Sequence, residues 1–329
     1  MKLLSPANSV ESAYVQIMNG ADELYFGGDT DAFRSFSFSG RGKQSPNGEA
    51  TFVNEQDIAH IVRLAKEKHV KTLFAANFFH LTDFTDKSGV KFKEMFLDYV
   101  NMGVDAGCDY IIAGDLGAIL LLRESGITTP IVASSFFDIT NVEQVMFFKD
   151  LGVRRVVISY QVLIDDINII SNTTDIELEI FGHYGCSFYD GCCNMKHCFG
   201  ESKEDNIGVP CQRRYDFAGE GIDMKNINVF NYALICSICS LPQLIRSGIS
   251  SLKIVGRSEE KNIIAEVTNT YRKAIDFIQL NPDIDDEKLI INIKKDILPR
   301  WWKQGLCLKK SCKYINKEMS GFYIGNSIV

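Results

Sequence analysis

The sequence lacks several features that would assign it to a common class of protein. It has no apolar run close to the ~20 residues that a membrane-spanning helix requires. Its opening residues, MKLLSPANSVES, contain neither the long apolar core nor the small-residue cleavage site of a signal peptide, so we expect a cytoplasmic protein. No GxGxxG fingerprint follows the first expected strand, and no phosphate-binding loop, GxSxG elbow or HExxH helix is present.

Positive charge is also scarce. The 35 Lys and Arg residues are outnumbered by 42 Asp and Glu residues, which gives a net charge of −7. This balance argues against a protein that coats nucleic acid, and the basic clusters KEKHVK and QRRY are short. From charge we therefore expect a small-molecule or peptide substrate rather than nucleic acid, and no membrane partner.

Short apolar strands alternate with amphipathic helices over most of the chain, which is typical of a parallel sheet. Asn8 and Ser9 are the expected capping residues of the first helix, in which Val10, Ala13, Tyr14 and Ile17 have the spacing of one buried face. The eight expected strands are Lys2–Ser5, Glu23–Gly27, Val70–Asn77, Asp109–Gly114, Pro130–Ser135, Arg154–Ser159, Ile176–His183 and Ser251–Gly256.

Eight strand–helix units in about 250 residues predict an α/β fold, a TIM-like (β/α)₈ barrel. A doubly wound open sheet is the alternative, disfavoured by the missing GxGxxG. We expect the barrel over residues 1–279, with a cysteine-rich insertion at 184–250 between the seventh and eighth strands. A short C-terminal extension, 280–329, is expected to pack on the barrel.

Barrel enzymes place their chemistry at the C-terminal ends of the strands. This rule selects four candidate substrate-binding residues: Asp115, Ser135, Tyr160 and Arg257. Asp115 fits the role of a helix cap slightly better than that of a pocket residue.

Cysteine is plentiful and clustered, with five of the ten cysteines between Cys186 and Cys211. In a reducing compartment, clustered thiols bind metal or carry out redox chemistry more often than they form disulfides. Single thiols spaced as Cys186-x6-Cys193-x17-Cys211-x24-Cys236 suit an iron–sulfur cluster better than a zinc knuckle. From spacing alone, a cluster, a zinc ion and buried free thiols all stay open.

Three segments resemble the collagenase-like U32 peptidase family: LEIFGHYGCSFYDGCC, VPCQRRYDF and CSICSLPQLIRSGISSLKIVGR. The opening LLSPANSVESAYVQIMNGADELYFGG and the late GFYIG, Gly321–Gly325, are also similar to that family. The resemblance implies a [4Fe-4S] cluster on four cysteines. It also implies oxygen-independent hydroxylation, which members perform on tRNA bases, rRNA bases or the ubiquinone ring, beside an older peptidase label.

The resemblance places the cluster ligands on Cys186, Cys193, Cys211 and Cys236. Zinc is the alternative metal, and Cys192 or Cys198 is the alternative to Cys193. Three further cysteines have no family counterpart and are expected to be free thiols: Cys239, Cys307 and Cys312.

Glu179 and His183 match the family's Glu-x-Phe-x-His pattern and are the expected catalytic residues. Alternation along the seventh strand predicts that Glu177, Glu179, Phe181 and His183 point to one side. A buried Glu179 requires a cationic partner, for which Lys253 and Arg257 are candidates.

Several charged family positions are replaced here. Tyr160 and Gln161 stand where the family commonly has Arg-Glu, Val255 stands where it has Glu, and Ser39 stands near strand two where an arginine is usual. The favoured function is an iron–sulfur hydroxylase. A peptidase and a non-catalytic, cluster-bearing partner subunit are the alternatives, and assembly as a homodimer or as a heterodimer with a related subunit stays open.

Overall fold

A computed structural model describes residues 1–30, 53–77, 91–184, 215–219, 222–227, 235–257 and 259–314. At its centre, eight parallel strands close into a barrel in the order β1-β12-β9-β8-β7-β6-β5-β2. Their bounds are β1 Lys2–Pro6, β2 Glu23–Phe26, β5 Lys71–Ala76, β6 Tyr110–Ala113, β7 Ile131–Ala133, β8 Arg155–Val157, β9 Glu177–His183 and β12 Ser251–Ile254. The TIM-like barrel and all eight expected strands are thereby confirmed.

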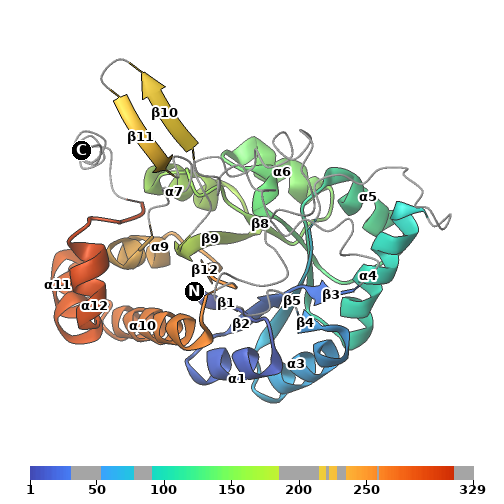
Figure 1. Ribbon diagram of the computed structural model, residues 1–329, viewed down its shortest axis with the longest axis horizontal. Coiled ribbons are helices and arrows are strands. Elements are labelled where there is room, and N and C mark those ends of the chain that lie inside the picture. Colours follow the sequence, from blue (N-terminus) through green and yellow to red (C-terminus); the bar gives the residue numbers. More distant parts are fainter. Residues whose placement is uncertain are drawn as a thin grey trace.

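Helices form the layer outside the barrel (Figure 1). The α-helices are α1 Val10–Met18, α3 Glu55–Glu67, α4 Phe92–Ala106, α5 Leu116–Glu124, α6 Val142–Asp150, α7 Ile164–Thr173, α9 Leu241–Arg246, α10 Lys261–Leu280, α11 Asp286–Asn292 and α12 Arg300–Trp302. The 3₁₀ turns η1 Ser135–Phe137 and η3 Ile238–Ser240 and the π-helical segments η4 Ile293–Ile297 and η5 Lys303–Cys307 complete the described helices. Among these residues, the structure has no helix with both the length and the apolar character to cross a membrane.

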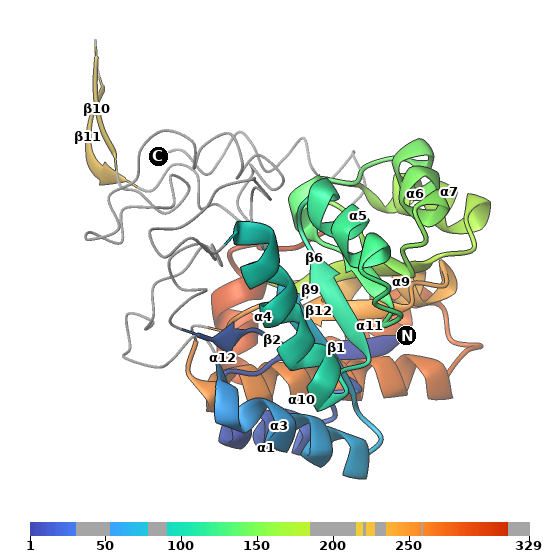
Figure 2. The ribbon, with the colours of Figure 1, turned by 90° about the vertical axis from the view of Figure 1, so that its right-hand side faces the viewer.

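Two short sheets lie outside the barrel. The strands β3, Gly28–Asp29, and β4, Val53–Asn54, pair in parallel. The strands β10, Tyr215–Gly219, and β11, Ile222–Ile227, form an antiparallel hairpin that projects from the body of the molecule in both ribbon views (Figures 1 and 2). Because β10 and β11 lie between β9 and β12, the insertion falls between the seventh and eighth barrel strands, as predicted.

Alternation of side chains gives the barrel its own core. Successive residues of a strand point to opposite sides, so one set packs under the helices and the other fills the lumen. The lumen set comes from seven of the eight strands or from residues just beyond them: Leu4, Tyr25, Leu73, Tyr110, Ile112, Val132, Val157, Tyr160 and Phe181.

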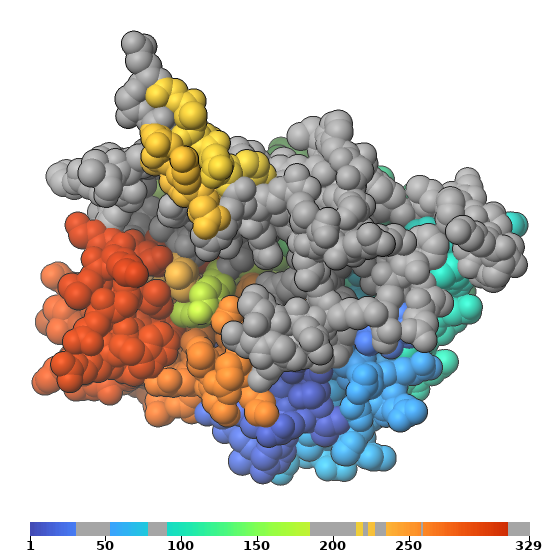
Figure 3. All heavy atoms as spheres, viewed as in Figure 1, coloured from blue at the N-terminus to red at the C-terminus, as the bar shows by residue number. Residues whose placement is uncertain are grey.

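The first helix shows a correction to the predicted buried face. Ser9 caps α1 as expected, but Tyr14 is 49% exposed. The buried face is partly polar because α1 packs on α10 through hydrogen bonds of Gln16, which donates to the Lys261 carbonyl (3.2 Å) and accepts from the Thr268 hydroxyl (2.8 Å). Figure 3 shows the two helices adjoining, α1 in blue and α10 in orange.

A buried ion network closes the N-terminal end of the barrel. Arg155, the first residue of β8, donates two hydrogen bonds to the Glu23 carboxylate, at 2.7 and 2.8 Å. It also donates to Glu177, the first residue of β9, at 2.9 Å. Arg155 and Glu23 are fully buried. In TIM-like barrels this end serves stability rather than catalysis, so we assign the network a structural role.

The region after α10 packs against the same core as the barrel helices. Ile293, Leu298 and Trp302 are buried in the main hydrophobic cluster. These contacts hold α12 and η5 beside η3, close to the C-terminal ends of β9 and β12.

Candidate functional site

Cys236 lies at the C-terminal end of β9. An isolated antiparallel bridge pairs it with His183, and the flanking amides of Tyr184 and Ser237 donate to the Ile235 and Gly182 carbonyls at 2.9 and 3.1 Å. These bonds fix the Cys236 backbone at the end of the barrel where TIM-like enzymes carry their active sites.

Of the predicted cluster ligands, only Cys236 belongs to the described part of the chain. Cys186, Cys193 and Cys211 lie outside the described residues, as do the alternatives Cys192 and Cys198. The described residues contain no group of three or more potential ligands arranged to hold a metal ion. The fit of a metal or cluster is therefore judged on Cys236.

The surroundings of Cys236 suit a thiolate ligand. Burial raises the pKa of its thiol to about 11, so the thiol is neutral unless a cation or metal compensates its charge. The indole N–H of Trp302 donates to the sulfur at 3.3 Å. Hydrogen bonds to cysteine sulfur are among the contacts by which proteins tune iron–sulfur clusters. The Cys236 thiol and its position at this end of the barrel therefore both fit a cluster ligand.

Three further free thiols gather near Cys236. Cys312 pairs with Cys236 in an isolated parallel bridge, and its thiol is hydrogen-bonded to that of Cys239. That bond, followed by the charge and hydrogen bond of Lys294, lowers the pKa of Cys239 against the opposing effect of burial. Cys307 lies close enough for the charges of Cys239 and Lys294 to affect its pKa.

Glu179 is fully buried, and its charge is compensated by two cations. Its carboxylate accepts from the Lys253 ammonium at 3.0 Å and from the Arg155 guanidinium at 3.3 Å. Lys253 was one of the predicted partners. Arg155 was not foreseen, and Arg257, the other candidate, lies elsewhere.

His183 departs from the predicted alternation. The register between β12 and β9 shifts by one residue near their C-terminal ends. Lys253 lies opposite Phe181, but the next residue of β12, Ile254, lies opposite His183. The imidazole lies against the rings of Tyr271, at 5.7 Å between centroids, and Trp302, at 4.7 Å. The prediction that His183 shares one side with Glu177, Glu179 and Phe181 is therefore wrong. The catalytic roles of Glu179 and His183 remain predictions.

Burial sets the protonation state of His183. Its side chain is 1% exposed, and burial, followed by the positive charge of Lys313, lowers the pKa of the imidazole to about 3. The ring is therefore neutral at neutral pH. Among the described residues, its Nδ1 atom has no hydrogen-bond partner.

The four predicted substrate-binding residues have different surroundings. The Asp115 carboxylate accepts from the Ala118 amide at 3.0 Å and caps α5. Ser135 begins the η1 turn, just after β7. Tyr160 belongs to the lumen set and is 8% exposed. The structure brings these residues to the same end of the barrel, since each follows the C-terminal end of a barrel strand.

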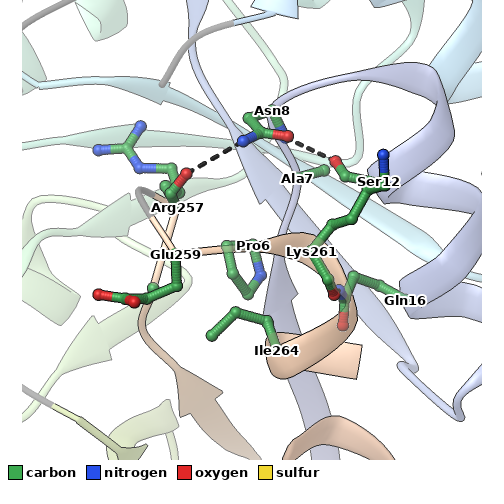
Figure 4. Close-up of a pocket in the computed structure, with 10 residues that line it drawn as sticks. Pro6, Ala7, Asn8, Ser12, Gln16, Arg257, Glu259, Lys261 and Ile264 are labelled. Carbon is green, nitrogen blue, oxygen red and sulfur yellow. Dashed lines mark hydrogen bonds between the residues drawn. The ribbon is translucent and has the colours of Figure 1, made fainter. Parts of the chain in front are cut away.

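Arg257 lines a small pocket between the loops that follow β1 and β12 (Figure 4). The Asn8 side chain donates to the Arg257 carbonyl at 3.1 Å across this pocket, and Glu259 and Lys261 lie on its other sides. The guanidinium carbon of Arg257 is 5.7 Å from the centroid of the Tyr25 ring. The interior space, about 10 Å³, admits about one water molecule.

Lys313 is a site residue that the sequence analysis missed. It is 2% exposed, and its ammonium lies 4.6 Å from the Tyr160 ring and 5.4 Å from the Phe181 ring. Its amide donates to the Cys236 carbonyl at 2.8 Å, and the Ser240 hydroxyl donates to the Lys313 carbonyl at 2.9 Å. No sequence signal marks it, because it lies in an irregular segment that only tertiary contacts bring to the barrel.

The fold and this site define a TIM-barrel protein with a buried cysteine and an aromatic-lined lumen at the catalytic end. A family model described as Peptidase family U32 matches residues 8–311, and the chain belongs to that family.

Curated relatives carry two kinds of name. The chain is 28% identical over 294 residues to tRNA hydroxylation protein P1 of Bacillus subtilis (strain 168), covering 86% of this chain and 64% of that protein. It is 28% identical over 286 residues to 23S rRNA 5-hydroxycytidine C2501 synthase of Escherichia coli (strain K12), covering 84% and 40%. It is 22% identical over 306 residues to a protein named Collagenase of Porphyromonas gingivalis (strain ATCC BAA-308 / W83), covering 88% and 68%. The chain thus spans less than two thirds of the first two.

These relatives correct the prediction about the substrate. A preference for a small molecule or peptide over nucleic acid was drawn from the net charge of −7, and the names of the tRNA and rRNA hydroxylation relatives contradict it. Net charge sums the whole molecule, whereas binding responds to the local field. An acidic total therefore does not argue against an RNA substrate.

Proposed function

We propose that the chain is an RNA-base hydroxylase that uses a [4Fe-4S] cluster held by Cys186, Cys193, Cys211 and Cys236. The observation that carries the proposal is the position of Cys236. It is buried at the catalytic end of the barrel, accepts a hydrogen bond from Trp302 and pairs with His183. Relatives named for hydroxylation of tRNA and rRNA support this chemistry.

When bound, the cluster supplies one-electron redox chemistry beside the barrel lumen. The chain's own residues do the rest. Trp302 holds the Cys236 sulfur by its hydrogen bond. Tyr160 and Phe181 form an aromatic wall of the lumen, and the Lys313 ammonium lies over both rings. Arg155 and Lys253 fix the Glu179 carboxylate in the lumen.

The His183 imidazole stays neutral at neutral pH because burial lowers its pKa to about 3. Its orientation is set by the rings of Tyr271 and Trp302. The ring therefore serves the site as a neutral hydrogen-bonding group, and among the described residues its Nδ1 has no partner.

The peptidase alternative has less support from the geometry. A serine- or cysteine-type hydrolase needs a nucleophile hydrogen-bonded to its general base. Within the described residues, His183 has aromatic neighbours and no hydrogen bond to a hydroxyl or a thiol.

The test is nucleoside analysis of RNA from cells that express the chain. The host is a bacterial strain from which its own U32 hydroxylase genes are deleted, and its tRNA and rRNA are digested and analysed by liquid chromatography with mass spectrometry. We expect a nucleoside one oxygen atom heavier than its parent with the wild type, and none with Cys236→Ala. Cys108→Ala is the matched control, because Cys108 is a buried thiol before β6, at the opposite end of the barrel.

Two results would change the conclusion. Absence of any oxygenated nucleoside with iron-loaded wild-type protein would contradict the proposal. Its appearance only after co-expression with a second U32 subunit would favour the partner-subunit alternative.

A further inference from the structure

Residues 293–313 have a charge opposite to that of the chain as a whole. They contain one carboxylate, Asp296, and seven cations, which gives +6 in a chain of net charge −7. The cations are Lys294, Lys295, Arg300, Lys303, Lys309, Lys310 and Lys313. The segment is therefore a strong local concentration of positive charge.

Most of these cations have no carboxylate partner among the residues that the structure describes. Within the described part of the chain, five of them form no ion pair with a carboxylate: Lys294, Lys295, Arg300, Lys303 and Lys309. The neighbouring region differs, because Arg246 pairs with Asp286 and Lys288 pairs with Asp285. Four of the five side chains are exposed, and Lys303 is half-buried.

Contacts within the segment bring its parts together. The Lys303 ammonium donates to the Lys295 carbonyl at 3.1 Å, which holds η5 against η4. Lys294 and Lys303 both lie close enough to Cys307 for their charges to lower the pKa of its thiol. The lysines of η4 and η5 therefore form one surface, which we call the basic surface and define as residues 293–310.

Trp302 connects the basic surface to the candidate site. Trp302 is fully buried and donates its hydrogen bond to the Cys236 sulfur. The preceding Trp301 is 41% exposed, and its indole is held by a hydrogen bond to Glu266 at 2.9 Å.

We propose that the basic surface is a docking site for the phosphate backbone of RNA, which it guides to the mouth of the barrel. The inference rests on the proposed function, because RNA is the polyanion which that function requires. Unneutralised lysines and arginines bind phosphates and release counterions, and the exposed face of Trp301 can stack on an unpaired base. The surface also explains how an acidic chain can bind RNA.

The test compares two triple variants that change net charge equally. Lys295→Glu/Arg300→Glu/Lys309→Glu alters three exposed residues of the basic surface. Lys66→Glu/Lys68→Glu/Lys71→Glu, the control, alters three exposed lysines of the KEKHVK cluster, at the N-terminal end of β5 and thus the opposite end of the barrel. Binding of a fluorescein-labelled, unmodified tRNA transcript is measured by anisotropy across a series of salt concentrations. Circular dichroism confirms that both variants are folded.

We expect the basic-surface variant to bind the transcript more weakly by on the order of tenfold or more, and its salt dependence to flatten by about 2–3 in the slope of log K against log salt. The control variant should keep most of the wild-type slope. Equal losses in the two variants would overturn the proposal. Loss of binding to phosphatidylglycerol vesicles with unchanged tRNA binding would also overturn it, in favour of a membrane surface.

The binding assay separates this inference from the proposed function. If tRNA binding depends on the basic surface but no oxygenated nucleoside forms, the proposed function fails and the docking surface stands. If oxygenated nucleosides form and the basic-surface variant binds normally, the docking surface fails alone.

Discussion

Replacement of Arg155 by methionine should strongly destabilise the barrel. Arg155 and two of its carboxylate partners, Glu23 and Glu179, are fully buried, and Glu177 is only 19% exposed. Removal of the guanidinium leaves these charges without their shared cation. Breaking a buried ion pair on one side typically costs about 3–5 kcal/mol, and we expect a loss of that size in the free energy of unfolding. The assay is urea denaturation followed by circular dichroism at pH 7.

The neighbouring Arg154 provides the matched control. Its side chain is 62% exposed and pairs with Glu177 at 3.1 Å. An exposed ion pair contributes at most about 1 kcal/mol, so Arg154→Met should leave stability nearly unchanged. Similar losses for Arg154→Met and Arg155→Met would refute the interpretation of the network.

The pH dependence gives a second test of the same variant. Burial, the largest influence, raises the pKa of Glu23, but the hydrogen bonds and charge of Arg155 outweigh it and leave the pKa below its usual value of 4.5. A carboxyl with a lowered pKa stabilises the fold above its unfolded pKa, and that stability is lost as the pH falls through the folded pKa. In Arg155→Met, burial should instead raise the pKa of Glu23. Protonation of Glu23 then removes the free-energy cost of burying its unpaired charge. The difference from wild type should therefore shrink from pH 7 towards pH 4.5, and a difference that grows on acidification would contradict the reasoning.

Three further predictions test other parts of the structure. Asp115→Ala should cost about 1 kcal/mol through loss of the α5 cap, whereas Asp115→Asn should keep it; a drop in oxygenated nucleosides with Asp115→Asn at unchanged stability would reveal a substrate contact. Gly103→Ala should destabilise by about 1–3 kcal/mol in urea denaturation, because its Cβ would lie 2.5 Å from Phe74, and Gly305→Ala, with open space around it, should not. Tyr271→Phe removes buried hydrogen bonds to Gly182 and Ser237 and should cost about 1–3 kcal/mol, measured in the same way.

The barrel could be predicted from the sequence because its signal is local. Each strand is a short apolar run between helix caps and glycines, and eight such units predict one closed topology. Ser9 and Asp115 were recognisable as caps for the same reason, since capping depends on a residue and its next three neighbours.

The site was harder to predict because long-range contacts decide it. The register shift between β9 and β12 falls at Gly182, and a glycine inside a strand often marks such an irregularity, but its effect on His183 depends on the pairing with β12. Arg155 and Glu23 are 132 positions apart, so their pairing is invisible to periodicity. The buried face of α1 is partly polar because Gln16 bonds to Thr268 of α10, a helix that packs on α1 but is far from it in the sequence. Lys313 is held at the mouth by bonds of its backbone to Cys236 and Ser240, which are far from it in the sequence.

The central claim is that four thiolates, one of them Cys236, hold an iron–sulfur cluster at the catalytic end of the barrel. The most direct test is iron and acid-labile sulfide analysis of protein purified without oxygen, with Cys236→Ala and Cys108→Ala analysed in parallel. The account predicts about four iron and four sulfide atoms per chain in the wild type and in Cys108→Ala, and a clear loss in Cys236→Ala. Wild-type protein with zinc in place of iron, or an unchanged iron content in Cys236→Ala, would contradict it.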